Sequence, residues 1–195
     1  MLIALAPSPA PAAAAKHAKA QPPPDSEHRR LGVLRAEDDR AAAAPALLEG
    51  LRDSLPELRA RAALACARIQ DSTLVAPLLP LLQDPVAAVR AQAAFALGQI
   101  GNHSARPALE AALSSKDTAL VDLAIEALGK LGDKSATPKV VAFLDDDSPR
   151  VRGEAAVALW RLADSTATDA LIAHHDDPDP EVRWRVLYAL EKIVN

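Results

Sequence analysis

Aromatic residues and cysteine are scarce in this sequence, and neither sign of charge dominates it. Cys66 is the only cysteine, which excludes an intramolecular disulfide and leaves the redox compartment open. The formal net charge is −4, so we expect no general attraction to nucleic acid or to an anionic membrane. No stretch approaches the roughly 20 apolar residues that a membrane-spanning helix needs. These absences argue against a disulfide scaffold, a polybasic nucleic-acid binder and a membrane span.

Motifs that carry chemistry are missing as well. The sequence has no glycine-rich phosphate-binding loop and no Gly-x-Ser-x-Gly nucleophile turn. One stretch, His174-His175-Asp176-Asp177, is locally similar to a set of metal ligands. Adjacent residues on a helix point about 100° apart, so a polar helix end is the expected interpretation and a metal site the alternative. We expect no cofactor and no catalytic residue.

What the sequence does contain is a repeat of 31 residues. Shifting Ile100 by this period gives an aliphatic column: Ile69, Ile100, Leu131, Leu162 and Ile193. The same shift applied to Ala96 gives alanine at every step: Ala65, Ala96, Ala127, Ala158 and Ala189. A fixed period in this range is the signature of a solenoid built from stacked supersecondary units.

Two helices fit into each period. The second helix carries apolar residues at i, i+4, i+7 and i+11, as in Val89, Ala93, Ala96 and Ile100, which is a helical stripe. The first helix carries its own apolar column: Leu47, Leu78, Leu109, Val140 and Leu171. Hydroxyl side chains are expected to cap the first helices, namely Ser72, Ser104, Ser135 and Thr166.

The sequence therefore predicts an all-α fold, a right-handed α-α superhelix (HEAT-like solenoid) of about five helix pairs. We expect the pairs near 41–69, 72–100, 103–131, 134–162 and 165–194. Residues 27–40 fit the period poorly and are expected to form an amino-terminal capping helix. Residues 1–26 are rich in Pro and Ala, which predicts a disordered tail or linker.

Charged residues recur with the same period. Each of four aspartates lies six residues before an arginine, giving the pairs Asp53 and Arg59, Asp84 and Arg90, Asp146 and Arg152, and Asp177 and Arg183. The middle unit loses both positions together, to Ser115 and Val121. We therefore expect each turn carboxylate to accept a forked guanidinium from the arginine of its own unit, as a structural ladder. A phosphate-binding arginine stripe is the alternative, and the aspartates would neutralise it.

Residues 84–101 follow the pattern Asp-Pro-x-x-x-Val-Arg-x-x-Ala-Ala-x-Ala-Leu-Gly-x-Ile-Gly. This pattern closely resembles the short bacterial HEAT-like repeat, also called the phycobilisome-lyase repeat, over roughly residues 41–195. The stretch Val182 to Leu190 is also similar to repeats that accompany cyclophilin-type isomerase domains. The resemblance implies a solenoid, and repeats of this kind serve many functions. Deoxyhypusine hydroxylases with related repeats bind a di-iron centre through His-Glu pairs, and no histidine here precedes a glutamate.

The remaining candidate site is a surface. We expect the second helices to line the concave side, where a stripe of side chains faces away from the core and binds a partner: Leu64, Phe95, Glu126, Val157, Trp160, Trp184 and Tyr188. Tryptophan and tyrosine are favoured anchors at protein interfaces. The alternative is that these rings only fill gaps between adjacent helices.

We thus expect a non-enzymatic protein-protein interaction scaffold with a protein or peptide partner. One alternative is an accessory repeat segment of a larger enzyme, such as a cyclophilin-type peptidyl-prolyl isomerase. A weaker one is a bilin lyase-like or nucleic-acid-binding enzyme. The compartment stays open, with the cytoplasm favoured and export as the alternative.

The carboxy-terminal helix predicts an interaction of its own. It offers Val186, Leu187, Leu190 and Val194 to a neighbour, and no further unit follows in the sequence. Because single repeats cannot bury their apolar faces alone, we expect self-association or a further domain at this end.

Overall fold

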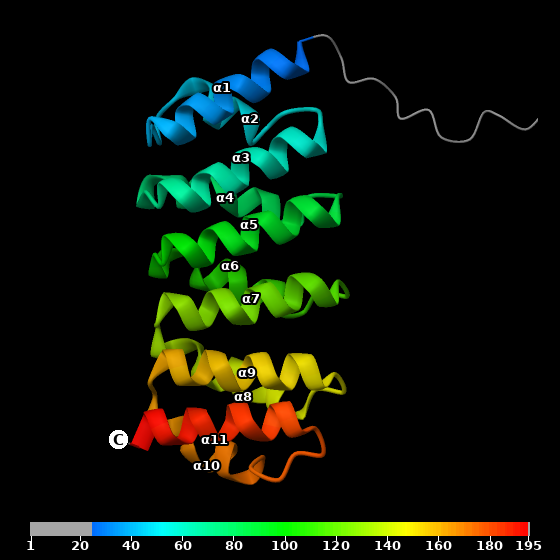
Figure 1. Ribbon diagram of the computed structural model, residues 1–195, viewed down its shortest axis with the longest axis vertical. Coiled ribbons are helices and arrows are strands. Elements are labelled where there is room, and N and C mark those ends of the chain that lie inside the picture. Colours follow the sequence, from blue (N-terminus) through cyan, green and yellow to red (C-terminus); the bar gives the residue numbers. More distant parts are fainter. Residues whose placement is uncertain (1–24, 195) are drawn as a thin grey trace, which may run out of the picture.

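The structure, a computed structural model, describes residues 25–194, and nearly all of the tail expected at 1–26 lies outside this range. Five long helices form one layer of the molecule: α3 (Pro56–Ile69), α5 (Ala87–Ile100), α7 (Thr118–Leu131), α9 (Pro149–Leu162) and α11 (Pro180–Val194). They are the second helices of the repeats and lie one above another in Figure 1. Helix α1 (Ser26–Asp38) packs on α2 and α3 at the amino-terminal end.

The first helices are short and form the layer behind. Three are single helices, α2 (Pro45–Gly50), α6 (Arg106–Ala112) and α10 (Thr168–Ala173). Two continue as 3-10 turns, α4 (Val75–Leu78) into η2 (Leu79–Gln83) and α8 (Thr137–Val141) into η5 (Ala142–Asp145). Pro80 accounts for the change in α4–η2, because its ring nitrogen cannot donate the α-helical hydrogen bond. Four further 3-10 turns open the first helices: η1 (Ser72–Leu74), η3 (His103–Ala105), η4 (Lys134–Ala136) and η6 (Ser165–Ala167).

Small residues let the second helices approach closely. A Cβ atom added to Gly129 would lie 2.7 Å from Ala158 Cα, and one added to Gly98 would lie 2.9 Å from Ala127 Cα. Contacts between residues are most numerous between successive second helices. The five long helices therefore form the tightly packed layer, and the short first helices bury their apolar column behind it.

The second helices α3, α5, α7 and α9 all end on a residue in the left-handed conformation. Glycine occupies this position in Gly101 and Gly132, with φ of 67° and 68°. Gln70 and Ala163 occupy it in α3 and α9 with φ of 58° and 50°. A left-handed residue closes a helix by returning its N–H to a carbonyl of the last turn, as Ala163 does to Leu159.

The expected hydroxyl caps of the first helices are wrong. The residue that accepts the backbone N–H comes before the 3-10 turn, and it is a carboxylate or amide side chain: Asp71, Asn102, Asp133 and Asp164. These residues form their own 31-residue column. Asp and Asn bind the N–H two residues ahead in an Asx turn more strongly than Ser and Thr do.

The described residues contain helices and no strand, which confirms the all-α solenoid. The first-helix column is fully buried, each member at 0 % exposure. Cys66 is also buried at 0 %, and burial raises the pKa of its thiol to about 12. Among the described helices none is long and apolar enough to cross a membrane.

Candidate functional site

The turn ladder of aspartates and arginines is present, and its geometry repeats along the stack. Arg59 donates from Nη1 to the carbonyl oxygens of Asp53 (2.8 Å) and Ser54 (3.2 Å) in its own turn. Its other edge forks onto Asp84 of the next unit, with Nε at 2.7 Å from Oδ2 and Nη2 at 2.9 Å from Oδ1. Arg59 therefore connects its own turn to the turn that follows.

The expected pairing within one unit is wrong. Arg90 contacts only the backbone of Asp84, at 2.8 Å, and its fork goes to Asp117. In the same way Arg152 binds the carbonyl of Asp146 at 2.9 Å and forks onto Asp177 at 2.7 and 2.8 Å. The ion pairs thus connect neighbouring repeats, and only the backbone bonds lie within a repeat.

The middle unit shows what the sequence analysis missed. Ser115 Oγ accepts the N–H of Asp117 at 3.1 Å, so the serine makes the backbone contact of the turn. The carboxylate of Asp117 accepts the fork of Arg90 in its place. Asp117 lies two residues outside the strict period, which hid it. Arg29 of α1 was missed for the same reason, and it binds Asp53 at 2.6 Å.

Val121 lacks a guanidinium, so among the described residues no arginine of the preceding unit forks onto Asp146, which keeps only the backbone contact common to these turns, the N–H of Ser148 at 2.8 Å. A different ion pair, Arg150 with the buried Asp122, joins α9 to α7 at this level.

The arginine forks also set the acidity of the turn carboxylates. The hydrogen bond from Arg59 holds the pKa of Asp84 below its usual value, and the bond from Arg152 does the same for Asp177. Both carboxylates are buried, at 9 % and 6 % exposure. Because their oxygens also accept backbone N–H groups, these residues are committed to structure and are not available to a ligand.

The expected partner-binding stripe lies on the second helices, and its members differ in exposure. Leu64, Val157 and Glu126 are half-buried. Glu126 forms an ion pair with Lys130 at 2.6 Å, and Lys130 Nζ lies 5.3 Å from the ring centroid of Phe95. These residues form a mixed apolar and charged surface over α3 to α9.

The aromatic members converge at one end of the stripe. The rings of Trp160 and Tyr188 meet edge to face at 5.3 Å, and those of Trp184 and Tyr188 stack at 5.4 Å. Trp160 and Tyr188 therefore cover the junction of α9 and α11, as the packing alternative requires. Trp184 remains 60 % exposed, so this three-ring cluster also presents a free aromatic surface.

An acidic recess lies on the same helices. Asp122, Glu126 and Glu154 line a cavity of about 270 Å³ together with Arg150. Burial raises the pKa of both Asp122 and Glu154, and the neighbouring charge of Glu126 raises that of Glu154 further. The guanidinium of Arg161 lies 5.9 Å from the Trp160 ring, and its positive charge partly offsets the rise in the pKa of Glu154.

The histidine pair does not form a metal site in the described part of the chain. His174 Nδ1 lies 2.7 Å from the carbonyl oxygen of Ala170, and Nε2 lies 3.1 Å from Asp145. His175 contacts the carbonyl of Ile172 at 2.8 Å. Within residues 25–194 no group of three His, Cys, Asp or Glu side chains is placed to hold a metal ion.

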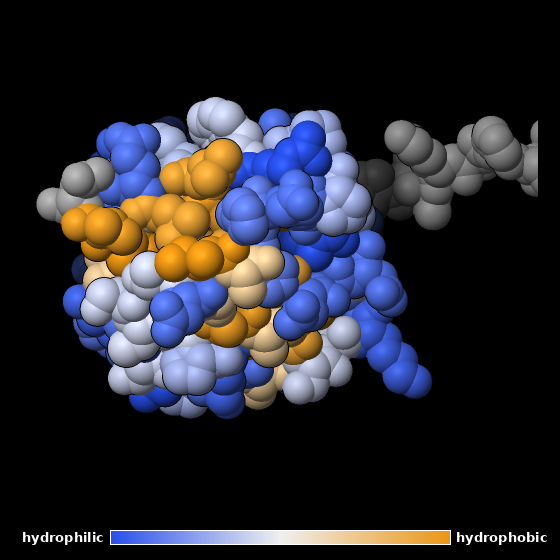
Figure 2. Space-filling view, turned by 90° about the horizontal axis from the view of Figure 1, so that it is seen from below, coloured by the Kyte–Doolittle hydropathy of each residue, from blue (hydrophilic) through white to orange (hydrophobic). Residues whose placement is uncertain are grey.

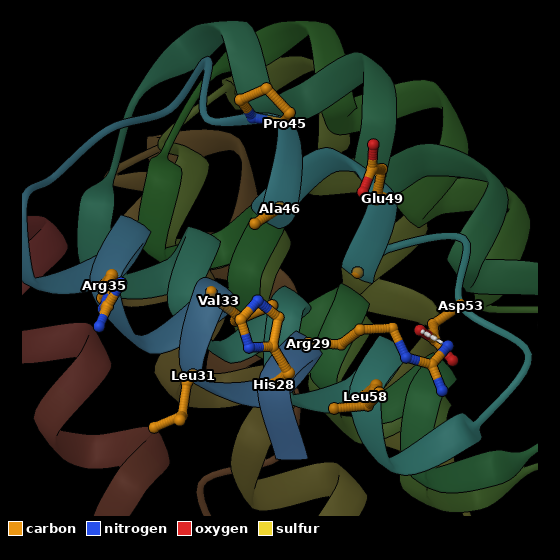
Figure 3. Close-up of a pocket in the computed structure, with 12 residues that line it drawn as sticks. His28, Arg29, Leu31, Val33, Arg35, Pro45, Ala46, Glu49, Asp53 and Leu58 are labelled. Atoms are coloured by element: carbon orange, nitrogen blue, oxygen red, sulfur yellow. Dashed lines mark hydrogen bonds and ion pairs between the residues drawn. The ribbon is translucent and has the colours of Figure 1, made fainter. Parts of the chain in front are cut away.

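A further cavity, of about 370 Å³, lies between α1 and the unit it caps. Figure 3 shows His28 and Leu31 of α1 on one side and Pro45 and Glu49 of α2 on another, with the ion pair of Arg29 at its edge. The two helices touch beside it, because a Cβ on Gly32 would lie 2.9 Å from Ala46. We assign no ligand to this cavity.

Comparison with known proteins supports the repeat architecture. A designed armadillo repeat protein in complex with the peptide (KR)4 is 21 % identical, with a TM-score of 0.65, over 83 % of this chain and 85 % of that one. The complex of CpcE and CpcF of phycocyanin lyase from Nostoc sp. PCC7120 is 26 % identical, with a TM-score of 0.63, over 88 % and 73 %. No curated protein matches the chain.

The family model for HEAT repeats matches residues 44–122 and 112–191, well over half of the chain. These ranges cover all five helix pairs and leave out α1. The same ranges carry the 31-residue columns, the buried first-helix leucines and the inter-repeat ladder. On this evidence the chain belongs to the HEAT-repeat family.

Proposed function

We propose that this protein is a non-enzymatic interaction scaffold that binds a protein or peptide on the face formed by its second helices. The observation that carries the proposal is the three-ring cluster of Trp160, Trp184 and Tyr188. Large aromatic side chains bury much area at low entropic cost, so they dominate the binding energy of interfaces. An exposed Trp184 beside two ordered rings is suited to this role.

The character of the face supports a protein ligand over a nucleic acid. Cations and carboxylates alternate on it, as in Lys130 with Glu126 and Arg185 with Glu154. A phosphate backbone requires a patch of one positive sign. A peptide chain carries apolar, hydrogen-bonding and charged groups together, which this mixture of rings, recess and ion pairs complements.

The similar structures agree with this use of the fold. The designed armadillo repeat protein holds a peptide, and CpcE is paired with CpcF. At these identities the likeness concerns the architecture, so the residues that bind must be tested on this chain.

The test is capture of partners by the full chain, followed by affinity measurement with the partner found. Trp160→Ala and Tyr188→Ala should each weaken binding about tenfold or more, because a hot-spot ring contributes over 1 kcal/mol. Leu31→Ala is the matched control, since Leu31 is similarly exposed at 48 % and lies on α1 at the opposite end. Unchanged affinity for both ring variants, with helicity preserved, would remove this face from consideration.

The likeness to the complex of CpcE and CpcF of phycocyanin lyase favours one alternative, a bilin lyase-like enzyme. Mixing the full chain with phycocyanobilin tests it directly. A shifted and sharpened visible absorption band on binding would support the alternative. An unchanged spectrum at high protein concentration would leave the interaction scaffold as the proposal.

A further inference from the structure

The carboxy-terminal end of the solenoid is unusually apolar. Of the six exposed large hydrophobic side chains in the described residues, four lie on α10 and α11: Ile172 (51 %), Trp184 (60 %), Leu187 (54 %) and Val194 (70 %). Figure 2 looks onto this end and shows the hydrophobic residues gathered into a patch. An exposed patch of this kind marks an interaction surface.

The repeat itself shows that this surface is built to be covered. The residues equivalent to Leu187 in the preceding second helices are all at 0 % exposure, namely Ala63, Ala94, Ile125 and Ala156. In each case the next helix pair covers the position. The prediction that Val186 is available to a neighbour is wrong, because this side chain is fully buried within its own unit.

The guanidinium of Arg183 provides a site for a carboxylate at the same end. Its Nη1 donates to the carbonyls of Asp177 (2.7 Å) and Pro178 (3.2 Å), as Arg59 does in its own turn. The forked edge of Arg59 holds an aspartate of the following unit. Within residues 25–194 no following unit exists to supply one for Arg183. The side chain is therefore held in position to receive a carboxylate from outside.

We propose that a second copy of this chain covers the end, with the two α11 helices packed antiparallel about a two-fold axis near Leu187. At 3.6 residues per turn, the side chains within about 60° of Leu187 are those of Pro180, Arg183, Trp184, Leu190, Glu191 and Val194. Their alternating three- and four-residue spacing is that of a coiled-coil seam.

The antiparallel register makes the charges complementary. Arg183 lies four residues before Leu187, and Glu191 lies four residues after it. A two-fold axis at Leu187 therefore places Arg183 of each copy opposite Glu191 of the other. Glu191 is exposed, and Lys192 at 3.3 Å is one of its partners. The pairing occurs twice, at both ends of an apolar seam.

A head-to-tail assembly is disfavoured by the other end of the molecule. There α1 covers the first unit, and Arg29 already occupies the carboxylate of Asp53 at 2.6 Å. This is the turn aspartate that an Arg183 arriving from another copy would need. A two-fold interface uses only the carboxy-terminal face, and it closes as a dimer.

Sedimentation equilibrium of the full chain tests the assembly. We expect a dimer at micromolar concentration, and Leu187→Glu should weaken association at least tenfold. Leu31→Glu, at a similarly exposed position on α1, should leave the dimer unchanged. A wild-type monomer across the concentration range would overturn the proposal, and so would equal loss of association in both variants.

Charge reversal tests the register. Arg183→Glu and Glu191→Arg should each weaken the dimer about tenfold or more, since each sets like charges against one another. The double variant should return association to within about threefold of the wild type, because the reversed charges face each other again. Residues 183 and 191 are two helical turns apart in one chain, so the recovery can only come from a contact between copies.

Glu191→Arg is the decisive single variant, since Arg183 also holds its own turn. Circular dichroism of each variant checks that helicity is preserved. Failure of the double variant to recover, with helicity intact, would reject the antiparallel arrangement.

Discussion

At the scale of single residues, this protein uses arginine for two tasks at once. In Arg59, Arg90 and Arg152, one nitrogen of the guanidinium closes the turn within a repeat through backbone carbonyls, and the opposite edge binds a carboxylate of the next repeat. A lysine has no planar fork, so it could not make both contacts. Stability along the stack therefore depends on pairs such as Arg59 with Asp84, which lie 25 residues apart in the sequence.

A double-mutant cycle on Arg59 and Asp84 should show coupling of about 0.5–3 kcal/mol, the range for contacting residues in one network. The matched control is the cycle on Arg90 and Asp84. These two meet only through the backbone carbonyl of Asp84, so their side-chain coupling should be much smaller. Chemical denaturation of the four variants in each cycle gives both values. Stronger coupling in the control cycle would contradict the inter-repeat pairing.

The loss of folding stability at acidic pH should depend on the aspartates of the turn ladder. Arginine hydrogen bonds lower the pKa of Asp84, Asp117 and Asp177. In this situation the unfolded chain binds protons more readily than the folded one, so stability is complete above the unfolded value near pH 4 and falls as pH decreases through the lowered values. Arg152→Gln should flatten that fall, as measured by denaturation midpoints between about pH 5 and pH 2. An unchanged slope would show that the ladder is not its source.

Replacing Ala163 with glycine should make the protein more stable. It adopts a left-handed conformation with φ of 50°, where the equivalent residues of the two preceding units are glycines. A side chain at this φ costs about 1–2 kcal/mol, part of which the extra flexibility of glycine in the unfolded chain offsets. Ala163→Gly should thus raise the thermal midpoint by a few degrees. The control is Ala119→Gly within helix α7, which should lower the thermal midpoint. If Ala163→Gly lowered the midpoint as well, Ala163 would not be strained.

At the scale of elements, the second helices define the molecule because small residues bring them together. The close approach of α7 and α9 places Gly129 against the backbone of Ala158, with no room for a side chain. Each first helix contributes one fully buried residue to the aliphatic column, and α4 and α8 continue as 3-10 turns while their column residues stay buried. The binding face we propose is therefore carried by the more closely packed of the two layers.

Gly129→Ala should destabilise the protein by about 1–3 kcal/mol, the usual cost of overpacking a tight contact. The added Cβ would lie 2.7 Å from a Cα atom, and a backbone atom cannot move aside as a side chain can. Gly101→Ala is the comparison, since no atom lies within 4 Å of its Cβ and only the φ of 67° opposes it. If the two variants lose the same stability, the close approach of α7 and α9 is not the reason that position 129 requires glycine.

At the scale of the whole molecule, the protein is a one-dimensional stack in which each unit touches only its neighbours. Its ends differ: α1 covers the amino-terminal end with an ion pair to Asp53, while α11 leaves Leu187 and Val194 exposed. The stack also has one interruption, at Val121, where Asp146 receives no arginine fork and Arg150 with Asp122 joins the units instead.

Deleting one full period across this interruption should give a shorter, folded solenoid. Removal of residues 102–132 leaves Asp146 25 residues after Arg90, the spacing of Arg59 and Asp84, so the ladder becomes continuous. We expect unchanged helicity per residue and a cooperative thermal transition by circular dichroism. Deletion of residues 102–128 breaks the period and is the control, which should unfold. Equal behaviour of the two deletions would show that register does not govern the stack.

The sequence by itself determined the period, the two helices of each unit, the buried columns and the ladder residues that keep the strict period. It did so because core burial recurs at every step and leaves an apolar residue at the same position of each copy. Asp117 and Arg29, which lie outside the strict period, were found only in the structure. Only the tertiary structure decided which partners meet. In a repeat of 31 residues, an aspartate six residues before an arginine implies another about 25 residues after it. The sequence pattern is identical for both contacts, and the stacking of adjacent turns selects the second, because it brings the carboxylate of the next unit to the open edge of the guanidinium.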